Sequence, residues 1–307
     1  MQRTLKSATY FTGVGLHGGH AVRMVVHPAS AETGIWFKRT DINGPQDNMI
    51  PARWDHVEQS QLCTLLINDA GVSVSTVEHL MAALYGCGIH NAIVELDGPE
   101  VPILDGSSIE FVKSFLNTGL VDQATPVRAI KVLKSVSVTQ GDVTASLAPS
   151  PVLEMDFAIE FSEAAIGAQQ KTVTMANGAF VHTLCDSRTF CKNSDVQAMR
   201  AKGLARGGTM DNAIVFDGDK VLSPSGLRHS DEPVRHKLLD AVGDLALAGA
   251  PLFAKYSGHK AGHAVTNKLL RALFADTSNY QMIECTPEQS QLLPGSGVLR
   301  SDVPELA

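Results

Sequence analysis

Val77-Glu-His-Leu-Met81 and Val234-Arg-His-Lys-Leu238 are two similar stretches that lie about half the chain apart. Gly86 matches Gly243 in the same alignment, and every paired position is separated by 157 residues. Each stretch begins an expected helix, which is followed by a short strand and a second helix. This repeated order indicates an internal duplication. Strands that cluster beside helices, without strict alternation, favour an α+β fold over a doubly wound sheet.

The expected elements divide the chain near residue 126, after a turn-like segment. Runs rich in Val, Ile and Leu predict strands, and apolar positions at helical spacing predict helices. Strands are predicted at 21–27, 35–40, 62–67, 91–96, 130–138, 152–161, 213–216 and 252–256, and helices at 76–85, 109–117, 195–202, 233–248 and 263–274. We therefore expect a first domain at 1–126 and a second at 127–307.

Composition excludes several classes of protein. With 307 residues, 44% of them hydrophobic and 19% charged, the chain can bury a core and is not typical of a disordered protein. The net charge of −7 and the absence of a Lys/Arg stripe argue against a nucleic-acid partner. No run approaches the roughly 20 apolar residues of a membrane span. Five scattered cysteines and no signal-peptide pattern predict free thiols in the cytoplasm.

A metal site is predicted from three residues. His236 and Asp240 are four positions apart on an expected helix, so they lie on one face. His79 is the natural third ligand, because it occupies the place of His236 in the other half. Three protein ligands with one open position are typical of catalytic zinc, although Fe(II) has similar preferences. A lone His-xxx-Asp is usually a surface pair, and the second histidine favours the metal.

Glu78 has two interpretations. Its spacing from Ser75 is that of a capping box, in which the glutamate satisfies the first N–H groups of its own helix. It could instead act as a general base beside the metal and take a proton from water. The residues alone favour the cap.

His263 stands at the expected start of a helix. It could donate to a tetrahedral intermediate or protonate a leaving amine, or it could be a polar loop residue. Asp244 lies one turn beyond Asp240, where it could orient His263 by a hydrogen bond or remain an ordinary exposed acid. A glycine-dense segment at 12–19 and a proline-bounded loop at 99–107 also indicate functional segments.

Six segments together resemble the UDP-3-O-acyl-N-acetylglucosamine deacetylases of lipid A biosynthesis, the LpxC family. The segments are TGVGLH (12–17), STVEHL (75–80), PEVPILDGS (99–107), SRTF (187–190), VRHKLLDAVGD (234–244) and GHAVTNK (262–268). The resemblance implies a zinc hydrolase that releases acetate from UDP-3-O-acyl-N-acetylglucosamine, an amphiphilic nucleotide sugar. It also implies two α/β sandwiches whose helices pack between the sheets.

The resemblance assigns the site residues. Zn²⁺ would be bound by His79, His236 and Asp240; the catalytic residues would be Glu78, His263, Thr189 and Asp244; the substrate contacts would be Lys237, Phe190, Phe161, Leu16 and Cys63. An inserted element at about 192–216 would form an apolar passage for the acyl chain. Because the site would lie between the two halves of one chain, we expect a monomer, in the cytoplasm that the cysteines indicate.

The sequence departs from the family pattern at a few positions. Cys191 and Lys192 stand where the family usually has glycine and an aromatic residue, and Pro233 replaces an aromatic residue. Two other functions therefore remain open. One is a zinc amidohydrolase acting on another acylated amine. The other is a non-catalytic binding protein in which zinc only joins the halves.

Overall fold

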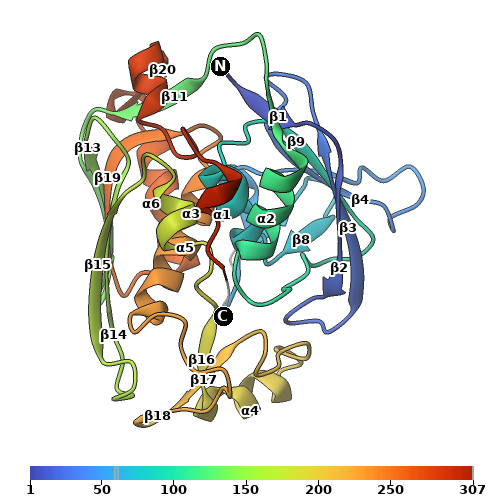
Figure 1. Ribbon diagram of the computed structural model, residues 1–307, viewed down its shortest axis with the longest axis vertical. Helices are drawn as coiled ribbons and strands as arrows, with labels where there is room; N and C mark the ends of the chain where they lie inside the picture. The colour runs from blue at the N-terminus through green and yellow to red at the C-terminus, as the bar shows by residue number, and fades with distance from the viewer. Residues whose placement is uncertain (59, 61, 306–307) are drawn as a thin grey trace.

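The computed structural model describes residues 1–58, 60 and 62–305. It confirms the predicted α+β class. Figure 1 shows a central layer of helices flanked by a sheet from each half of the chain. The main helices of this layer are α1 (Glu78–Gly86), α2 (Ile109–Thr118), α5 (Glu232–Ala246) and α6 (His263–Phe274). The two sheets therefore enclose the core from opposite sides.

The first half builds a five-stranded mixed sheet in the order β2-β3-β9-β4-β5. Its strands are β2 (Thr9–Val14), β3 (Ala21–Pro28), β9 (Ala92–Leu96), β4 (Ile35–Arg39) and β5 (Met49–Pro51). Side chains alternate along β3, where Val22, Met24 and Val26 are buried. A small sheet of β6 (Val57–Glu58), β7 (Leu65–Ile67) and β8 (Ser73–Ser75) leads the chain into α1.

The second half builds a larger sheet around β19 (Leu252–His259). β13 (Val143–Pro149) pairs antiparallel with β19, whereas β11 (Arg128–Val132) and β14 (Glu154–Glu160) run parallel to it. The remaining strands are β12 (Val136–Gln140), β15 (Ala168–Thr174) and β20 (Tyr280–Glu284). Two short helices, α3 (Ala179–Thr183) and α7 (Pro287–Gln291), lie outside the repeated elements.

The two halves repeat the same order of elements. Helix α1 leads to β9, which pairs parallel with β4, and helix α5 leads to β19, which pairs parallel with β11. A second helix, α2 or α6, then follows in each half. This order supports the inferred duplication, and it places α1 and α5 against each other in the central layer.

Helix α1 is buried along its whole length. Strong helix formers such as Leu, Met and Ala suit a helix that packs on every side. Its partner α5 comes close because position 243 is glycine: a Cβ there would overlap the Glu78 carbonyl oxygen. Helix α1 ends before Gly88, which has a positive φ of 68°, and the Arg3 guanidinium donates to the Cys87 carbonyl. Close packing of α1 on α5 therefore depends on Gly243.

Two local predictions are wrong. Ser75 does not cap α1: it ends β8, Thr76 has a φ of 57°, and the helix begins at Glu78. The strand predicted at 130–138 is two strands, because the amides of Leu133 and Lys134 both donate to the Asn279 carbonyl and turn the chain between β11 and β12. Both errors come from contacts with residues that are distant along the chain.

The chain passes from the first half to the second after β1 (Arg3–Leu5) pairs with β10 (Leu120–Asp122). The proposed boundary between residues 126 and 127 falls in this connection; the last two residues of the proposed second domain, 306–307, lie outside the described chain. A separate sheet of β16 (Phe190–Lys192), β17 (Ile214–Asp217) and β18 (Lys220–Val221) carries α4 (Asn193–Ala201). It projects at the lower end of Figure 1 and extends past the predicted end of the insert.

None of the described helices combines the length and the apolar character that a membrane span requires.

Candidate metal centre and active site

Three buried side chains from α1 and α5 converge between the halves. Asp240 Oδ1 lies 3.5 Å from His79 Nε2 and 3.3 Å from His236 Nε2. The ligand atoms of the three residues all lie within 4.8 Å of one another. The structure thus brings together the residues that the duplication and the i, i+4 spacing predicted as a set.

The hydrogen bonds around these side chains fit a metal ion. Asp240 Oδ1 is buried and has no hydrogen-bond partner within the described chain, whereas Oδ2 accepts from Lys237 Nζ at 2.8 Å. His236 Nδ1 donates to the Ser187 carbonyl at 3.0 Å, so the Nε2 lone pair faces Asp240. An unpaired buried carboxylate oxygen is costly unless a cation binds it. Two imidazole nitrogens and one carboxylate oxygen are a ligand set that Zn²⁺ accepts.

The protonation states also suit metal binding. Burial lowers the pKa of His236 to about 4, so its imidazole is neutral at pH 7. Burial alone would raise the pKa of Asp240, but its interactions with His236 and with the Lys237 ammonium group outweigh burial and hold that pKa well below its ordinary value. A neutral imidazole and an ionised carboxylate are the forms that coordinate metals.

Beside the triad, Glu78 and Asp244 both face His263. Glu78 Oε1 lies 3.7 Å from His263 Nε2, and Asp244 Oδ2 lies 2.9 Å from His263 Nδ1. The structure therefore places an imidazole between two carboxylates, one from each half. Such an arrangement can accept a proton at one point and donate one at another.

Electrostatics separates the two groups that could transfer protons. Burial raises the pKa of Glu78, although the positive charge of His263 opposes the rise. Burial alone would lower the pKa of His263, but the charges of Asp244 and Glu78 outweigh it and raise that pKa to about 9. His263 is therefore a cation at pH 7 and can act as a proton donor, while Glu78 can act as a base.

A cavity of about 440 Å³ opens onto these groups. Its wall includes His79, His236, Asp240, Glu78, His263, Thr189, Lys237, Phe190, Phe161 and Leu16, together with residues of the insert. Among the described residues, Asp244 and Cys63 are the predicted site residues that do not line it. Burial and the Glu78 charge raise the pKa of the Cys63 thiol to about 11. A larger cavity, of about 550 Å³, lies elsewhere between the halves, and none of the described residues in its wall is a predicted site residue.

Comparison with known proteins identifies the family. The family model described as UDP-3-O-acyl N-acetylglycosamine deacetylase matches residues 2–275. The chain belongs to this deacetylase family. This confirms the resemblance that the sequence motifs indicated.

Relatives named UDP-3-O-acyl-N-acetylglucosamine deacetylase match most of the chain. One, from Phenylobacterium zucineum (strain HLK1), is 49% identical over 274 residues, which cover 89% of this chain and 93% of the relative. Another, from Shewanella frigidimarina (strain NCIMB 400), is 42% identical over 301 residues and covers 96% and 98%. A third, from Pasteurella multocida (strain Pm70), is 42% identical over 291 residues and covers 94% and 95%. The family is a metalloenzyme family, and His79, His236 and Asp240 form a possible metal-binding triad in this chain.

Glu100 joins two of the deacetylase motifs, although it was not among the predicted site residues. Its carboxylate accepts from the amides of His17 and Gly18, at 2.7 and 2.8 Å, and from the Thr76 hydroxyl at 3.0 Å. A Cβ at Gly15 would overlap the same carboxylate, so the close approach requires glycine. The proline-bounded loop thus holds the glycine-dense segment in place. Its position in a motif was the signal that could have found it.

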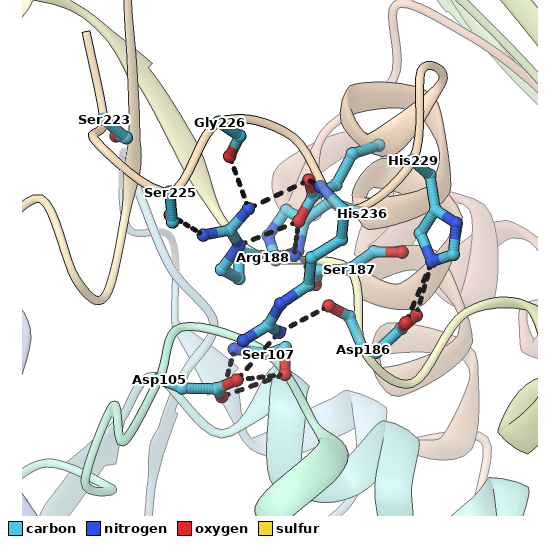
Figure 2. Close-up of polar contacts among 12 residues, drawn as sticks. Asp105, Ser107, Asp186, Ser187, Arg188, Ser223, Ser225, Gly226, His229 and His236 are labelled. Atoms are coloured by element: carbon cyan, nitrogen blue, oxygen red, sulfur yellow. Dashed lines mark hydrogen bonds and ion pairs between the residues drawn. The ribbon is translucent and has the colours of Figure 1, made fainter. Parts of the chain in front are cut away.

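A buried ionic network lies next to the candidate site of the deacetylase (Figure 2). Arg188 Nε donates to Glu232 Oε1 at 2.9 Å, and the Arg188 amide donates to the same oxygen at 3.0 Å. The guanidinium also donates to Ser225 Oγ and to the Gly226 carbonyl. These contacts hold Arg188, and the residue before it, Ser187, accepts a hydrogen bond from the candidate ligand His236.

The same network joins the two halves of the deacetylase. Arg228 Nη1 donates to Asp105 Oδ2 at 2.9 Å and to the Asp186 carbonyl at 2.7 Å. Asp105 lies in the proline-bounded loop, where it also accepts from Ser107, as Figure 2 shows. His229 Nε2 lies 2.9 Å from Asp186 Oδ2. Arg228 thereby links the proline-bounded loop of the first half to the segment that precedes Ser187, beside the candidate metal site.

Proposed function

We propose that this deacetylase hydrolyses the N-acetyl group of UDP-3-O-acyl-N-acetylglucosamine, giving UDP-3-O-acyl-glucosamine and acetate, an early committed step of lipid A biosynthesis. We also propose that its metal is Zn²⁺. One observation carries the proposal beyond family membership. Asp240 Oδ1 is buried between two imidazoles, with no hydrogen-bond partner among the described residues, beside an acid–base pair.

His79, His236 and Asp240 would hold the ion. When bound, Zn²⁺ acidifies water and polarises an amide carbonyl. Lys237 occupies the second oxygen of Asp240, which leaves Oδ1 as the oxygen available for coordination. The Ser187 carbonyl keeps His236 in the tautomer that coordinates through Nε2.

Glu78 and His263 would divide the proton transfers. Glu78, with its raised pKa, accepts the proton of the attacking water. His263, protonated at neutral pH, stabilises the oxyanion and then protonates the leaving amine. Asp244 keeps His263 protonated and oriented through the contact at Nδ1. In this order of steps, Glu78 gains a proton and loses its negative charge, and His263 then gives up its proton.

Thr189 would add a hydroxyl to the oxyanion site. Its amide donates to the Gly106 carbonyl and its carbonyl accepts from Ile214, both at 2.8 Å, so its backbone is held on both sides. A donor on a fixed backbone can stabilise charge without rearranging during the reaction. Thr189 lines the same cavity as Glu78 and His263.

The remaining cavity residues suit an amphiphilic substrate. Lys237 is a cationic contact for a nucleotide sugar, while Phe190, Phe161 and Leu16 offer apolar surface. Met199 and Leu204 of the insert extend that surface, as an acyl passage requires. The ammonium group of Lys192 lies near Glu163 and Asp195, at 3.7 and 3.5 Å, and is partly neutralised by them. Cys63, in contrast, is buried near Glu78, and we propose that it supports the wall of the cavity.

The location and assembly follow as parts of the proposal. All five cysteines, each within the described residues, are free thiols, which supports a reducing cytoplasm. Every proposed ligand and catalytic group comes from one chain, so a monomer is sufficient for the reaction.

The test is acetate release from UDP-3-O-acyl-N-acetylglucosamine, measured with and without a chelator and combined with metal analysis. We expect turnover that the chelator removes and that added Zn²⁺ restores. Turnover that a chelator leaves unchanged, in protein shown to be free of metal, would contradict the proposal. Equal rates with and without the 3-O-acyl chain would instead favour an amidohydrolase of another acylated amine.

A further inference from the structure

Thr64 contacts both carboxylates that face His263, and it has no role in the function proposed above. It precedes β7 and is only 3% exposed. Its amide donates to Glu78 Oε2 at 3.0 Å, and its hydroxyl donates to Asp244 Oδ1 at 2.6 Å. Both of its donors are therefore used on carboxylates of the candidate site.

The contacts form a closed ring of four residues. Thr64 binds one oxygen of each carboxylate, and the other oxygen of each carboxylate faces one ring nitrogen of His263. Because a carboxylate is planar and rigid, fixing one oxygen directs the other. Thr64 thereby aims Glu78 Oε1 and Asp244 Oδ2 at opposite sides of the same imidazole.

The ring also crosses the boundary between the halves. Glu78 begins α1, whereas Asp244 lies on α5, and Thr64 bridges them from the segment that precedes both. The Thr64 carbonyl accepts from the Val77 amide at 3.5 Å, which ties Thr64 to the start of α1. A hydrogen bond to an ionised carboxylate is stronger than one between neutral groups. Removing the hydroxyl would leave Asp244 Oδ1 buried without this donor.

We propose that Thr64 is a positioning residue, which couples the general base Glu78 to the His263–Asp244 pair across the two halves of the molecule. This inference rests on the proposed deacetylase function. Thr64 acts through the two carboxylates and does not itself transfer a proton. Its hydroxyl holds Asp244 so that His263 stays aligned, and its amide holds Glu78 on the side of the attacking water.

The test separates the hydroxyl from the backbone amide. Thr64→Val keeps the amide and the shape of the side chain but removes the donor to Asp244. We expect kcat for acetate release to fall about 10- to 100-fold, as loss of a hydrogen bond to a charged group predicts, with KM and metal content unchanged. Thr64→Ser retains the hydroxyl and should recover most of the wild-type kcat.

Thr9→Val is the matched control, because Thr9 is also 3% exposed and its hydroxyl has no partner within the described part of the chain. It should leave kcat unchanged. In an Asp244→Ala background, Thr64→Val should change kcat by no more than about 2-fold, since its acceptor is gone. If Thr64→Val does not fold, Thr64→Ala against Thr64→Ser makes the same comparison.

Two results would overturn the inference. One is wild-type kcat in Thr64→Val, and the other is an equal loss in both backgrounds. If the wild-type protein itself releases no acetate, the proposed function fails instead. If the wild-type protein releases acetate and Thr64→Val has the same kcat, only this inference fails and the proposed function stands.

Discussion

Helix α5 carries three buried carboxylates, and two of them, Glu232 and Asp240, lie about two turns apart in different surroundings. Glu232 is 0% exposed, and both of its oxygens accept hydrogen bonds: Oε1 from the amide and Nε of Arg188, and Oε2 from the Arg228 amide. Asp240 is 5% exposed, and within the described residues its Oδ1 accepts none, although two imidazole nitrogens face it.

This difference distinguishes a buried carboxylate with a structural role from one that can bind a metal. A buried carboxylate with every acceptor satisfied contributes to a fixed local structure. A buried carboxylate with an unpaired oxygen that faces other metal-binding atoms carries a free-energy cost of burial, and a bound cation removes that cost. Glu232 should therefore matter for stability, and Asp240 for metal binding and turnover. The predictions below test that division.

The largest effect is expected for Asp240→Asn. It removes a proposed ligand, and because substitutions around ligands already cost about 10- to 100-fold in metal affinity, we expect a loss of at least about 100-fold. Acetate release should fall to background. Metal affinity is measured by competition with a chelator. A variant that keeps both metal and turnover would break the comparison.

Glu78→Gln should lower kcat by about 10²- to 10⁴-fold, the usual contribution of a general base, while the protein keeps its metal. It sharpens the comparison because Glu78 is a buried carboxylate of an intermediate kind, with one oxygen held by Thr64 and the other facing His263. Metal content and acetate release are measured on the same sample. Loss of the metal in this variant would mean that Glu78 is needed for metal binding, contrary to the division of roles.

Glu232→Ala should lower the free energy of unfolding by about 3–5 kcal/mol, because it leaves Arg188 buried without its counter-charge. Denaturant unfolding measures the change. Folded protein at low temperature should still bind metal. The double variant Arg188→Leu with Glu232→Leu serves as the control: it removes both charges and should be more stable than Glu232→Ala alone. A Glu232→Ala protein of normal stability that cannot bind metal would reverse the proposed roles.

The smallest effect concerns pH. The pKa of His263 is raised from 6.5 to about 9 in the folded protein, so the folded state holds this proton more tightly than the unfolded state. Its contribution to stability is complete below pH 6.5 and is lost as the pH rises through about 9. Unfolding of the metal-free protein across that window measures it. Asp244→Asn should reduce this dependence, and an unchanged dependence would show that Asp244 does not hold the proton.

The sequence was sufficient to predict that the three candidate metal ligands come together. The i, i+4 spacing places His236 and Asp240 on one helical face whatever surrounds the helix, because helix geometry is local. The duplication supplied His79, since equivalent helices of two similar halves can pack against each other. The start of α6 at His263 was also predicted, as local signals define helix ends.

Other parts of the site depend on contacts that no spacing encodes. The capping-box prediction for Ser75 failed because a tertiary partner, the Thr64 amide, takes the Glu78 carboxylate. Glu100 lies in a recognised motif, but its three donors come from two other segments. The strand predicted at 130–138 was broken by contacts with Asn279.

By itself, then, the sequence determined the α+β class, the deacetylase family and the three candidate ligands, because periodicity, duplication and motifs are properties of order along the chain. Only the tertiary structure decided which buried carboxylate keeps an oxygen free, and that Thr64 meets Asp244 across 180 positions. The physical reason is that hydrogen-bond satisfaction depends on every neighbour in space, and those neighbours come from both halves of the folded chain.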